Sequence, residues 1–364
     1  MQTQILEIDE NSLYRSKKII EAGGAVAFPT ETVYGLGANA YDTAAVENIF
    51  KIKGRPNDNP LIVHVHSGFD IESLVSFVPD YAKKLAKAYL PGPLTMVYKS
   101  KGKVSPAVSC GLDTLAIRIP SHAGAQAFLK YVNLPIAAPS ANISKHVSPT
   151  AAEHVFADLN GKIEIILNGG NCTGGIESTV LDCTGDIPVI LRSGLVTREM
   201  IKKVAGDFGE YVLKEGEKAK SPGMKYKHYS PNCRTVLFGY AERDKAVKLY
   251  NNENNAYILC DDKTAKVVNV KRVLNLGKTE AEIASNLYSK LREGENVASI
   301  IIAIAPENQG GVMTGVMNRL SKACGVNYER KNEEKAQKGI VRLHGQHVPQ
   351  SNGGSAVKNK TQKK

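Results

Sequence analysis

Polar side chains gather at three places in this sequence where an apolar strand is predicted to end. The three segments are Lys53-Gly-Arg-Pro-Asn-Asp-Asn59, Ser140-Ala-Asn142 and Arg192-Ser-Gly194. In α/β folds, ligands bind at the edge where strands end, and converging cations, amides and hydroxyls are suited to hold the phosphates of a nucleotide. The pattern therefore predicts an enzyme that uses ATP.

The standard nucleotide-binding loops are missing from the sequence. It contains no Gly-x-x-x-x-Gly-Lys-Ser/Thr segment and no Gly-x-Gly-x-x-Gly at a strand-to-helix turn. Gly35-Leu-Gly37 is too short to count as a dinucleotide-binding motif. ATP, if it binds, must therefore be held by side chains and irregular loops.

Each of these polar residues also has a purely structural explanation. Lys53 and Arg55 stand at the C-terminal end of a predicted helix, where cations suit the helix dipole in any protein. His64 ends a predicted buried strand and could be a satisfied core residue, whereas Arg118 lies in an alternating strand and could face solvent. Ser148 could simply cap the next helix. Taken one by one the signals are weak, and their order along the chain is what favours a common site.

Helical and strand patterns alternate through the first part of the chain. Helices are predicted at 12–22, 43–53, 79–89, 123–131, 150–159 and 197–204. Strands are predicted at 25–28, 61–65, 94–98, 115–119, 136–138, 163–167, 179–182 and 189–191. We expect an α/β domain with a sheet of about seven strands, several of them apolar enough to be buried on both faces.

A second, smaller alternation follows a lapse of the pattern after Gly206. Strands are predicted at 235–238, 257–259 and 299–303, and helices at 242–250, 280–292 and 312–323, as in a compact Rossmann-like βαβ domain. The segment 221–231 has prolines near both ends and no usable period, so it is predicted to connect the domains. The predicted division is a catalytic domain at 1–206, a linker at 207–234, a C-terminal domain at 235–327 and a tail at 328–364.

Composition and targeting signals exclude several protein classes. The chain has 364 residues, of which 42% are hydrophobic and 23% are charged, as in ordinary soluble globular proteins. No apolar run approaches the roughly 20 residues of a membrane-spanning helix, and residues 1–11 lack the pattern of a secretory signal. The six cysteines are far apart, which argues against a structural zinc site. We expect reduced thiols in a cytoplasmic protein that does not bind membranes.

The net charge of +11 is concentrated near the C-terminus. Residues 331–364 carry seven Lys and one Arg against two Glu, which is +6 in a polar segment without periodicity. Such a segment is predicted to be disordered. It could be a solvated terminus, or it could contact RNA weakly, and the sequence leaves both explanations open.

Several motifs closely resemble those of the YrdC-like family. They are Pro29-Thr-Glu-Thr-Val-Tyr-Gly-Leu-Gly37, the Lys-x-Arg at 53–55, Asn59-Pro-Leu-Ile-Val-His64, Pro91-Gly-Pro-Leu-Thr95, Ala138-Pro-Ser-Ala-Asn142 and Glu177-Ser-Thr179. The connector Pro222-Gly-Met-Lys-Tyr-Lys-His-Tyr-Ser-Pro231 and the domain behind it resemble the two-domain form of that family, the threonylcarbamoyl-adenylate synthases. The resemblance covers roughly residues 5–325. Ile176 stands where Val is commoner, which is a conservative departure.

The resemblance implies a twisted mixed sheet with flanking helices and a specific reaction. L-threonine, bicarbonate or CO2, and ATP would give threonylcarbamoyl-AMP and pyrophosphate, and a threonylcarbamoyl transferase complex would then use the product to make N6-threonylcarbamoyladenosine in tRNAs that read codons starting with A. By similarity, the threonine site consists of Thr32, His64, Arg118, Ala138 and Ser178. The ATP site consists of Arg55, Asn59, Thr114, Ser140, Asn142, Ser148 and Arg192.

The implied chemistry fits the residue types at these positions. Threonine's amine adds CO2 to become a carbamate, and a carbamate oxygen attacks the α-phosphorus and expels pyrophosphate. Lys53 and Arg55 are the expected catalytic residues, and with Arg192 they could neutralise the gathered anions in a site with little water. Magnesium is expected on the ATP phosphates, without a dedicated protein metal site. Positioning and charge stabilisation would suffice, so no protein nucleophile is expected.

Two further expectations concern the amino acid and the connector. Arg118 is expected to hold threonine's carboxylate, because a guanidinium offers two parallel hydrogen bonds where a lysine offers a point charge. The connector, through 225–229, carries too many charged and aromatic residues for an inert spacer. It is expected to fold over the site as a lid that keeps water from the labile intermediate.

Two other functions remain alternatives at this stage. A non-catalytic RNA-binding protein of the same fold would explain the positive charge, but it would not explain His64 and Ser178. A carbamoyl-transfer enzyme acting on another substrate would also use a YrdC-like domain. The lack of acylphosphatase-like and zinc-finger segments argues against that second alternative.

Overall fold

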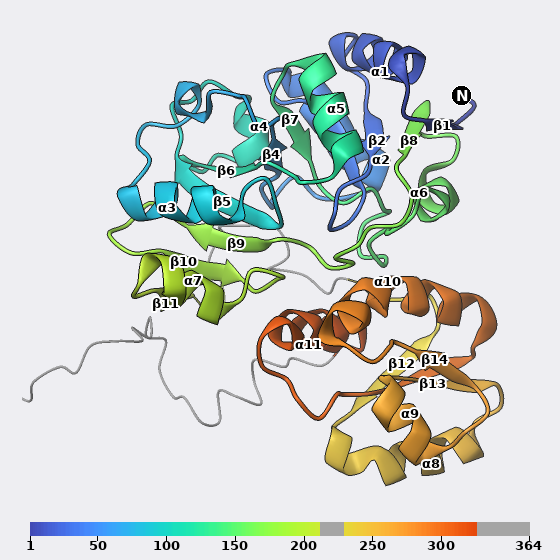
Figure 1. The fold of residues 1–364 in the computed structure, drawn as a ribbon. Helices are drawn as coiled ribbons and strands as arrows, with labels where there is room; N and C mark the ends of the chain where they lie inside the picture. The colour runs from blue at the N-terminus through green and yellow to red at the C-terminus, as the bar shows by residue number, and fades with distance from the viewer. Residues whose placement is uncertain (212–228, 326–364) are drawn as a thin grey trace, which may run out of the picture.

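The computed structural model describes residues 1–211 and 229–325. These residues form two sheets, an eleven-stranded one and a four-stranded one, each flanked by helices (Figure 1). The predicted mixed α/β fold, followed by a smaller domain with a parallel sheet, is confirmed. The predicted tail and residues 212–228 of the predicted linker lie outside the described residues.

The larger sheet combines parallel and antiparallel pairs in the order β1-β8-β2-β3-β7-β4-β6-β5-β9-β10-β11. Its strands are β1 (Gln4–Glu7), β2 (Val26–Phe28), β3 (Gly35–Asn39), β4 (Ile62–His64), β5 (Leu94–Lys99), β6 (Thr114–Arg118), β7 (Ile136–Ala138), β8 (Ile165–Asn168), β9 (Thr179–Asp182), β10 (Val189–Arg192) and β11 (Gly209–Glu210). The helices are α1 (Glu10–Glu21), α2 (Thr43–Lys53), α3 (Asp80–Tyr89), α4 (Pro106–Ser109), α5 (Ala123–Val132), α6 (Ala152–Leu159) and α7 (Arg198–Ala205), with a 3-10 turn at Ile71–Ser73.

The expected sheet of about seven strands is wrong, because β1, β3 and β11 are additional strands of the same sheet. β1 lies at an edge and is mostly exposed, and β11 has two residues, so neither has a clear alternating pattern. β3 is missed because its sequence begins Gly-Leu-Gly. A Cβ atom on Gly37 would lie 2.5 Å from Ile136 of β7, so the close strand approach requires glycine there.

Three neighbouring strands at the centre of this sheet place chemistry-bearing residues on one face. β4 and β6 are parallel, with His64 directly opposite Arg118, and β7 runs antiparallel to β4, with Ala138 opposite Ile62. Directly paired residues point to the same side of a sheet, and residues two apart in one strand do so as well. His64, Arg118, Ile62 and Ala138 therefore share a face.

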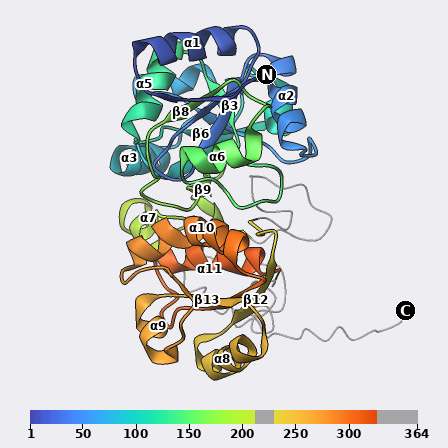
Figure 2. The same cartoon turned by 90° about the vertical axis from the view of Figure 1, so that its right-hand side faces the viewer.

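The smaller sheet is wholly parallel, in the order β12-β15-β13-β14. Its elements are β12 (Arg234–Phe238), a 3-10 turn (Tyr240–Glu242), α8 (Arg243–Asn252), β13 (Ala256–Cys260), α9 (Asp262–Val268), β14 (Val273–Asn275), α10 (Glu280–Val297), β15 (Ile300–Ile304) and α11 (Val312–Ala323). The sequence patterns missed α9 and β14, which are short. Helices α8 and α9 cover one face of the sheet, and α10 and α11 lie on the face turned toward the larger domain (Figure 2).

Apolar packing joins the two domains through α10 and α11. A single hydrophobic cluster contains Leu287 and Val316 of these helices together with Val33, Val147 and Ile176 of the larger domain. Gly175 has a φ of +67°, and a Cβ atom there would lie 2.4 Å from the carbonyl oxygen of Ala284 in α10. The close approach of the α10 backbone therefore requires glycine at this position.

None of the helices formed by residues 1–211 and 229–325 is long and apolar enough to cross a membrane. All six cysteines fall within these residues and are free thiols.

A cluster of charged groups also spans the domain interface. Arg292 of α10 donates to both carboxylate oxygens of Asp158 in α6, at 3.1 and 2.9 Å. His146 lies between Asp158 and Glu295 of α10, with ring nitrogens 3.0 and 2.9 Å from their carboxylates. Burial alone would lower the pKa of His146, but its bonds to Asp158 and Glu295 raise that pKa to about 9. His146 is therefore a cation at neutral pH.

This cluster predicts how stability depends on alkaline pH. The folded-state pKa of His146 lies above its ordinary value of 6.5, so its contribution is complete below that pH and is lost as the pH rises through about 9. The melting temperature should therefore fall between pH 6.5 and 9. His146→Gln should lower stability at pH 6 and flatten this alkaline loss, measured by calorimetry across the range. If the melting temperature fell as steeply with rising pH in the variant as in the original chain, His146 would not be the group responsible.

Candidate active site

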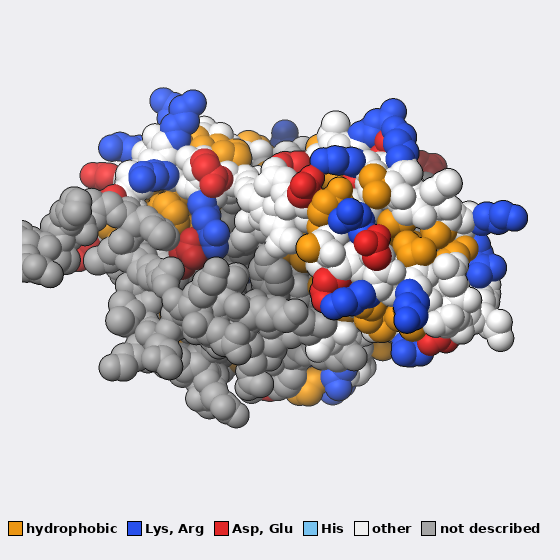
Figure 3. Space-filling view, turned by 90° about the horizontal axis from the view of Figure 1, so that it is seen from below, with side chains coloured by type: hydrophobic (Ala, Val, Ile, Leu, Met, Phe, Trp, Pro, Cys, Tyr) orange, Lys and Arg blue, Asp and Glu red, His pale blue; other side chains and the backbone are white. Residues whose placement is uncertain are grey.

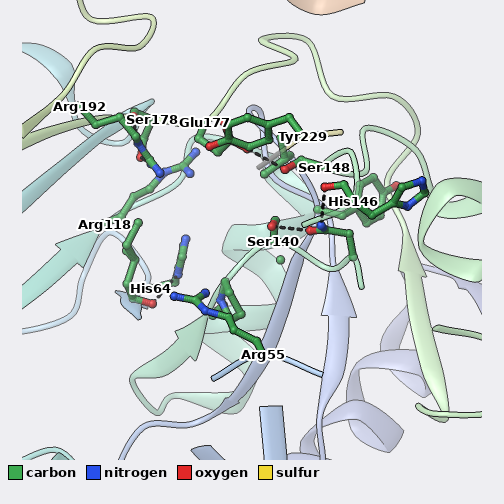
Figure 4. A pocket seen from close by; sticks show the side chains of 17 residues that line it. Arg55, His64, Arg118, Ser140, His146, Ser148, Glu177, Ser178, Arg192 and Tyr229 are labelled. Atoms are coloured by element: carbon green, nitrogen blue, oxygen red, sulfur yellow. Dashed lines mark hydrogen bonds between the residues drawn. The ribbon is translucent and has the colours of Figure 1, made fainter. Parts of the chain in front are cut away.

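One pocket collects most of the residues that the sequence singled out (Figure 4). The pocket opens to solvent, and its empty space is about 650 Å³ when the open solvent at its mouth is included. Its lining is Val33, Tyr34, Gly35, Arg55, Ile62, His64, Arg118, Ala138, Pro139, Ser140, Asn142, His146, Ser148, Glu177, Ser178, Arg192 and Tyr229. Nine of the predicted site residues are in this set: Arg55, His64, Arg118, Ala138, Ser140, Asn142, Ser148, Ser178 and Arg192.

The pocket lies over a face of the sheet, which corrects the expectation that strand ends alone would form it. Ala138 ends β7 beside Ile62, the first residue of β4, whereas His64 ends β4 beside Arg118. The end of β7 therefore lies at the opposite end of β4 from His64. The residues still meet because their side chains share the face described above.

His64 contributes a neutral imidazole to the pocket wall. The side chain is 4% exposed, its Nδ1 lies 3.2 Å from the carbonyl oxygen of Ile62, and its ring meets Phe28 edge-on. Because a carbonyl only accepts, Nδ1 must carry the proton, which makes Nε2 an acceptor. Burial, followed by the nearby Arg118, lowers the pKa of His64 to about 3. His64 can therefore accept a hydrogen bond at any physiological pH.

Arg118 is held in place by a carboxylate that the sequence reasoning left out. Its Nη2 donates to Glu31 at 2.8 Å and its Nε to the carbonyl oxygen of Gly92 at 3.4 Å. Glu31 also accepts from the backbone amide of Ser121 at 3.1 Å. The guanidinium is 4% exposed, so the possibility that Arg118 faces solvent is wrong. Glu31 lies within the Pro29 motif, but its partner is 87 residues away along the chain.

Ser178 and Arg192 form a joined pair on the same side of the pocket as Arg118 (Figure 4). Arg192 donates from Nε to the Ser178 carbonyl oxygen at 3.1 Å and from Nη2 to the Ser178 hydroxyl at 3.2 Å. The same hydroxyl lies 2.7 Å from that of Thr95. Figure 4 shows Arg192, Arg118 and Arg55 around a common space, with Ser140 and Ser148 across it.

Lys53 lies behind the pocket wall and does not line the cavity. Its ammonium group is buried and donates to the carbonyl oxygens of Ser140 and Asn142, with Asn142 Oδ1 at 3.4 Å. Burial, and then the charge of Arg55, lower the pKa of Lys53 well below its ordinary value. Lys53 therefore fixes the 140–142 loop, which carries two predicted ATP-binding residues.

Arg55 and Asn59 form a second group beside this loop. Arg55 lines the pocket, packs over the ring of Phe50 and donates to the Asn59 carbonyl oxygen at 2.7 Å. Asn59 is fully buried, and both polar atoms of its amide lack a hydrogen-bond partner within the described part of the chain. A buried amide without partners is costly, so this group is suited to meet a ligand.

Thr32 and Thr114, like Lys53 and Asn59, are not part of the pocket lining. Thr32 is fully buried one residue before the lining residue Val33, and its hydroxyl lies 2.9 Å from that of Thr30. Thr114 begins β6 at the opposite end from Arg118. Thr114, a predicted ATP contact, therefore lies at the end of β6 away from Arg118 and does not line the pocket.

The capping explanation for Ser148 is wrong. Helix α6 begins after Ala151 and has no side-chain cap, whereas the Ser148 hydroxyl donates to the Glu177 carboxylate at 2.7 Å. The sequence analysis identified Glu177 only as the residue before Ser178 in the Glu177-Ser-Thr179 motif. Its role in the wall depends on partners in the other domain, which no local pattern reveals.

Tyr229 brings the end of the predicted connector to the pocket. It lines the cavity, is 5% exposed and stacks on Tyr288 of α10, with ring centroids 5.3 Å apart. The adjacent Ser230 amide donates to the Lys145 carbonyl oxygen at 3.1 Å. The remaining connector residues that suggested a lid, at 225–228, lie outside the described residues, so the lid stays a prediction.

Family models match both parts of the chain. Residues 18–194 match the model described as "Telomere recombination". Residues 196–325 match the model described as "Threonylcarbamoyl-AMP synthase, C-terminal domain".

Curated relatives and solved structures agree with these matches. Threonylcarbamoyl-AMP synthase of Pyrococcus abyssi is 43% identical over 87% of this chain and 95% of that protein. The Bacillus subtilis protein of the same name is 42% identical over 89% of this chain and 96% of its own. The crystal structure of Pyrococcus abyssi Sua5 complexed with L-threonine matches with a TM-score of 0.82 at 40% identity, covering 89% of this chain and 98% of that one. The chain therefore belongs to the threonylcarbamoyl-AMP synthase family, in its two-domain form.

Proposed function

We propose that this protein makes threonylcarbamoyl-AMP and pyrophosphate from L-threonine, bicarbonate or CO2, and ATP, as a nucleotidyltransferase. The observation that carries the proposal is the single pocket in which Arg118, His64 and Ser178 share a cavity with Arg55, Ser140, Ser148 and Arg192. The similarity to a protein crystallised with L-threonine supports the amino acid as one substrate.

The threonine end of the site is the group around Arg118. Its guanidinium, oriented by Glu31, meets the carboxylate, because planar bidentate pairing suits that partner. The acceptor nitrogen of His64 and the hydroxyl of Ser178 meet threonine's polar groups, and Ala138 supplies backbone and a small apolar surface. Thr32 acts from behind the lining through its neighbour Val33.

The ATP end is the group around the 140–142 loop. Arg55, Ser140, Asn142, Ser148 and Arg192 bring cations and donors to the cavity, with Ser140 and Ser148 across it from Arg192, and the unpartnered amide of Asn59 belongs to the residue whose carbonyl oxygen Arg55 binds. Thr114 stays a predicted ATP contact outside this lining. Arg55 and Arg192 stabilise the charge that develops as pyrophosphate leaves, and Lys53 acts by holding the loop.

Magnesium would be held through phosphate oxygens of ATP. The residues fit this role, because both glutamates near the substrates, Glu31 and Glu177, are engaged by Arg118 and Arg319. Among residues 1–211 and 229–325, no three His, Cys, Asp or Glu side chains are arranged so that they could hold a metal ion. The ion, when bound with ATP, would neutralise phosphate charge during the displacement.

The product would pass to a threonylcarbamoyl transferase that modifies tRNA, in the cytoplasm. We also propose weak tRNA contact through the tail, whose residues lie outside the described part of the chain. On the face shown in Figure 3, the described lysine and arginine side chains are interspersed with acidic and apolar ones, a pattern that gives the RNA-binding alternative no added support.

The reaction is tested by the release of pyrophosphate from ATP. Release should require both L-threonine and bicarbonate, and omission of either should reduce it to background. Release that proceeds equally without threonine would contradict the proposed amino-acid substrate. Salt-sensitive tRNA binding without any turnover would favour the RNA-binding alternative.

Arg118→Lys tests the threonine end. A lysine cannot serve Glu31 and a carboxylate at once with the planar geometry of a guanidinium, so the KM for threonine should rise about tenfold or more. The KM for ATP should change far less, as measured by initial rates with each substrate varied. Arg234→Lys, at an exposed arginine paired with Glu253, is the matched control and should change neither KM. Equal increases in both KM values would remove Arg118 from the threonine site.

Lys53→Met tests whether this lysine acts through the loop. Loss of the ammonium leaves two buried carbonyl oxygens without their donor, which should cost about 1–3 kcal/mol of unfolding free energy and raise the KM for ATP. Lys51→Met, on the exposed side of the same helix, is the control. A variant of unchanged stability whose kcat falls by about tenfold or more would instead indicate direct action on the phosphates.

A further inference from the structure

A buried carboxylate stands in the wall of the pocket. Glu177 is 8% exposed and lines the cavity next to Ser178. One of its oxygens accepts from the Ser148 hydroxyl at 2.7 Å, and the other accepts from Tyr288 at 2.9 Å and from Arg319 Nε at 3.1 Å. Tyr288 and Arg319 belong to α10 and α11, so half of this arrangement comes from the C-terminal domain.

The negative charge of Glu177 has the same sign as the charges of the proposed ligands. ATP and the carboxylate of threonine are anions, and an uncompensated negative charge in a dry wall would repel them. Glu177 is nevertheless ionised. Burial alone would raise its pKa, but Arg319 and then Arg192 lower the pKa of Glu177 to about 2. The carboxylate therefore depends on these arginines for its compensation.

The two arginines are not equivalent. Arg192 lines the pocket and is bonded to Ser178, so its charge faces the cavity. Arg319 does not line the pocket, is fully buried and contacts Glu177 directly. Arg319 therefore compensates Glu177 directly, from behind the wall.

Arg319 also fixes the backbone on which the pair Ser178 and Arg192 is built. Its guanidinium donates to the carbonyl oxygen of Ser193, next to Arg192, and to that of Glu177 at 3.3 Å. Helix α11 can approach this closely because residue 315 is glycine. A Cβ atom there would lie 3.2 Å from Gly194 Cα.

We propose that Arg319 is a positioning residue for ATP binding, which neutralises Glu177 from the C-terminal domain so that this wall of the pocket does not present an uncompensated negative charge to the phosphates. The C-terminal domain thereby contributes a compensating charge to the pocket, although Arg319 itself does not line the cavity. The proposal rests on the proposed function insofar as ATP is the ligand. Tyr288 assists by donating to the same carboxylate.

The test measures ATP binding by titration calorimetry in the full chain. Arg319→Met should weaken ATP binding about tenfold or more, because Glu177 is left as an unpaired charge beside the phosphates. Arg319→Met combined with Glu177→Gln removes both charges and should recover most of that loss. Glu177→Gln alone provides the reference for the double variant. Arg319→Lys keeps the charge and should bind ATP more tightly than Arg319→Met.

The dependence on pH separates compensation of charge from loss of packing. In Arg319→Met the pKa of Glu177 should rise, since burial is no longer opposed by Arg319. The ratio of the variant's Kd to that of the original chain should therefore shrink as the pH falls and Glu177 takes up a proton. Arg292→Met, which breaks another interdomain ion pair, is the matched control, and Glu177→Gln should not rescue any loss it causes.

The outcomes distinguish this inference from the proposed function. If the original chain does not bind ATP, the proposed function itself fails. If it binds ATP and Arg319→Met binds equally well, only the role of Arg319 is overturned. A folded Arg319→Met whose loss is constant with pH and is not recovered by Glu177→Gln would also overturn it. Should Arg319→Met fail to fold, Arg319→Gln, which also removes the charge, decides the question by the same two criteria, with and without Glu177→Gln.

Discussion

Arg118 donates to Glu31 and Arg319 donates to Glu177, in both cases with less than an eighth of either side chain exposed to water. A buried guanidinium is tolerated only when acceptors replace its hydration, and a buried carboxylate needs donors for the same reason. A pocket for several anions must nevertheless retain cationic groups that its own structure does not fully neutralise. The arrangement of charges around this constraint explains which residues face the cavity and which lie behind it.

In the described structure, the cations that face the ligands and the cations that support the pocket wall are different residues. Arg55, Arg118 and Arg192 line the cavity, whereas Lys53 and Arg319 lie behind it and bind backbone carbonyl oxygens or the wall carboxylate. The residues behind the wall therefore hold the loops and strands that carry the lining. Because Arg319 comes from α11, the second domain is part of this support, and the apolar contacts of Ile176 and Val147 with that domain maintain it.

Local patterns in the sequence were sufficient for regular, apolar elements. The helix at Thr43–Lys53 and the strands at Ile136–Ala138 and Thr179–Asp182 have the predicted bounds, because periodicity and neighbouring turn residues agree there. β3 was missed because its glycines interrupt the alternation of apolar and polar residues. Gly37 is needed there because the side chains of Ile136 and Phe28 leave no room for a Cβ atom. Most of the pocket lining was identified through motifs of the YrdC-like family. The ion pairs of Glu31 with Arg118 and of Glu177 with Arg319 were not predicted, since the partners are 87 and 142 residues apart and only tertiary structure joins them. The domain boundaries, the ligand assigned to each site residue and the cytoplasmic location stay predictions.

The central claim is that one cavity holds the amino acid beside the nucleotide. Its most direct test is a crystal structure of the full chain with L-threonine and a non-hydrolysable ATP analogue. The account predicts the threonine carboxylate at Arg118 and the phosphates among Arg55, Ser140 and Arg192, with the threonine amine facing the α-phosphate. Ligands bound in separate regions, or a nucleotide bound away from the 140–142 loop, would contradict it.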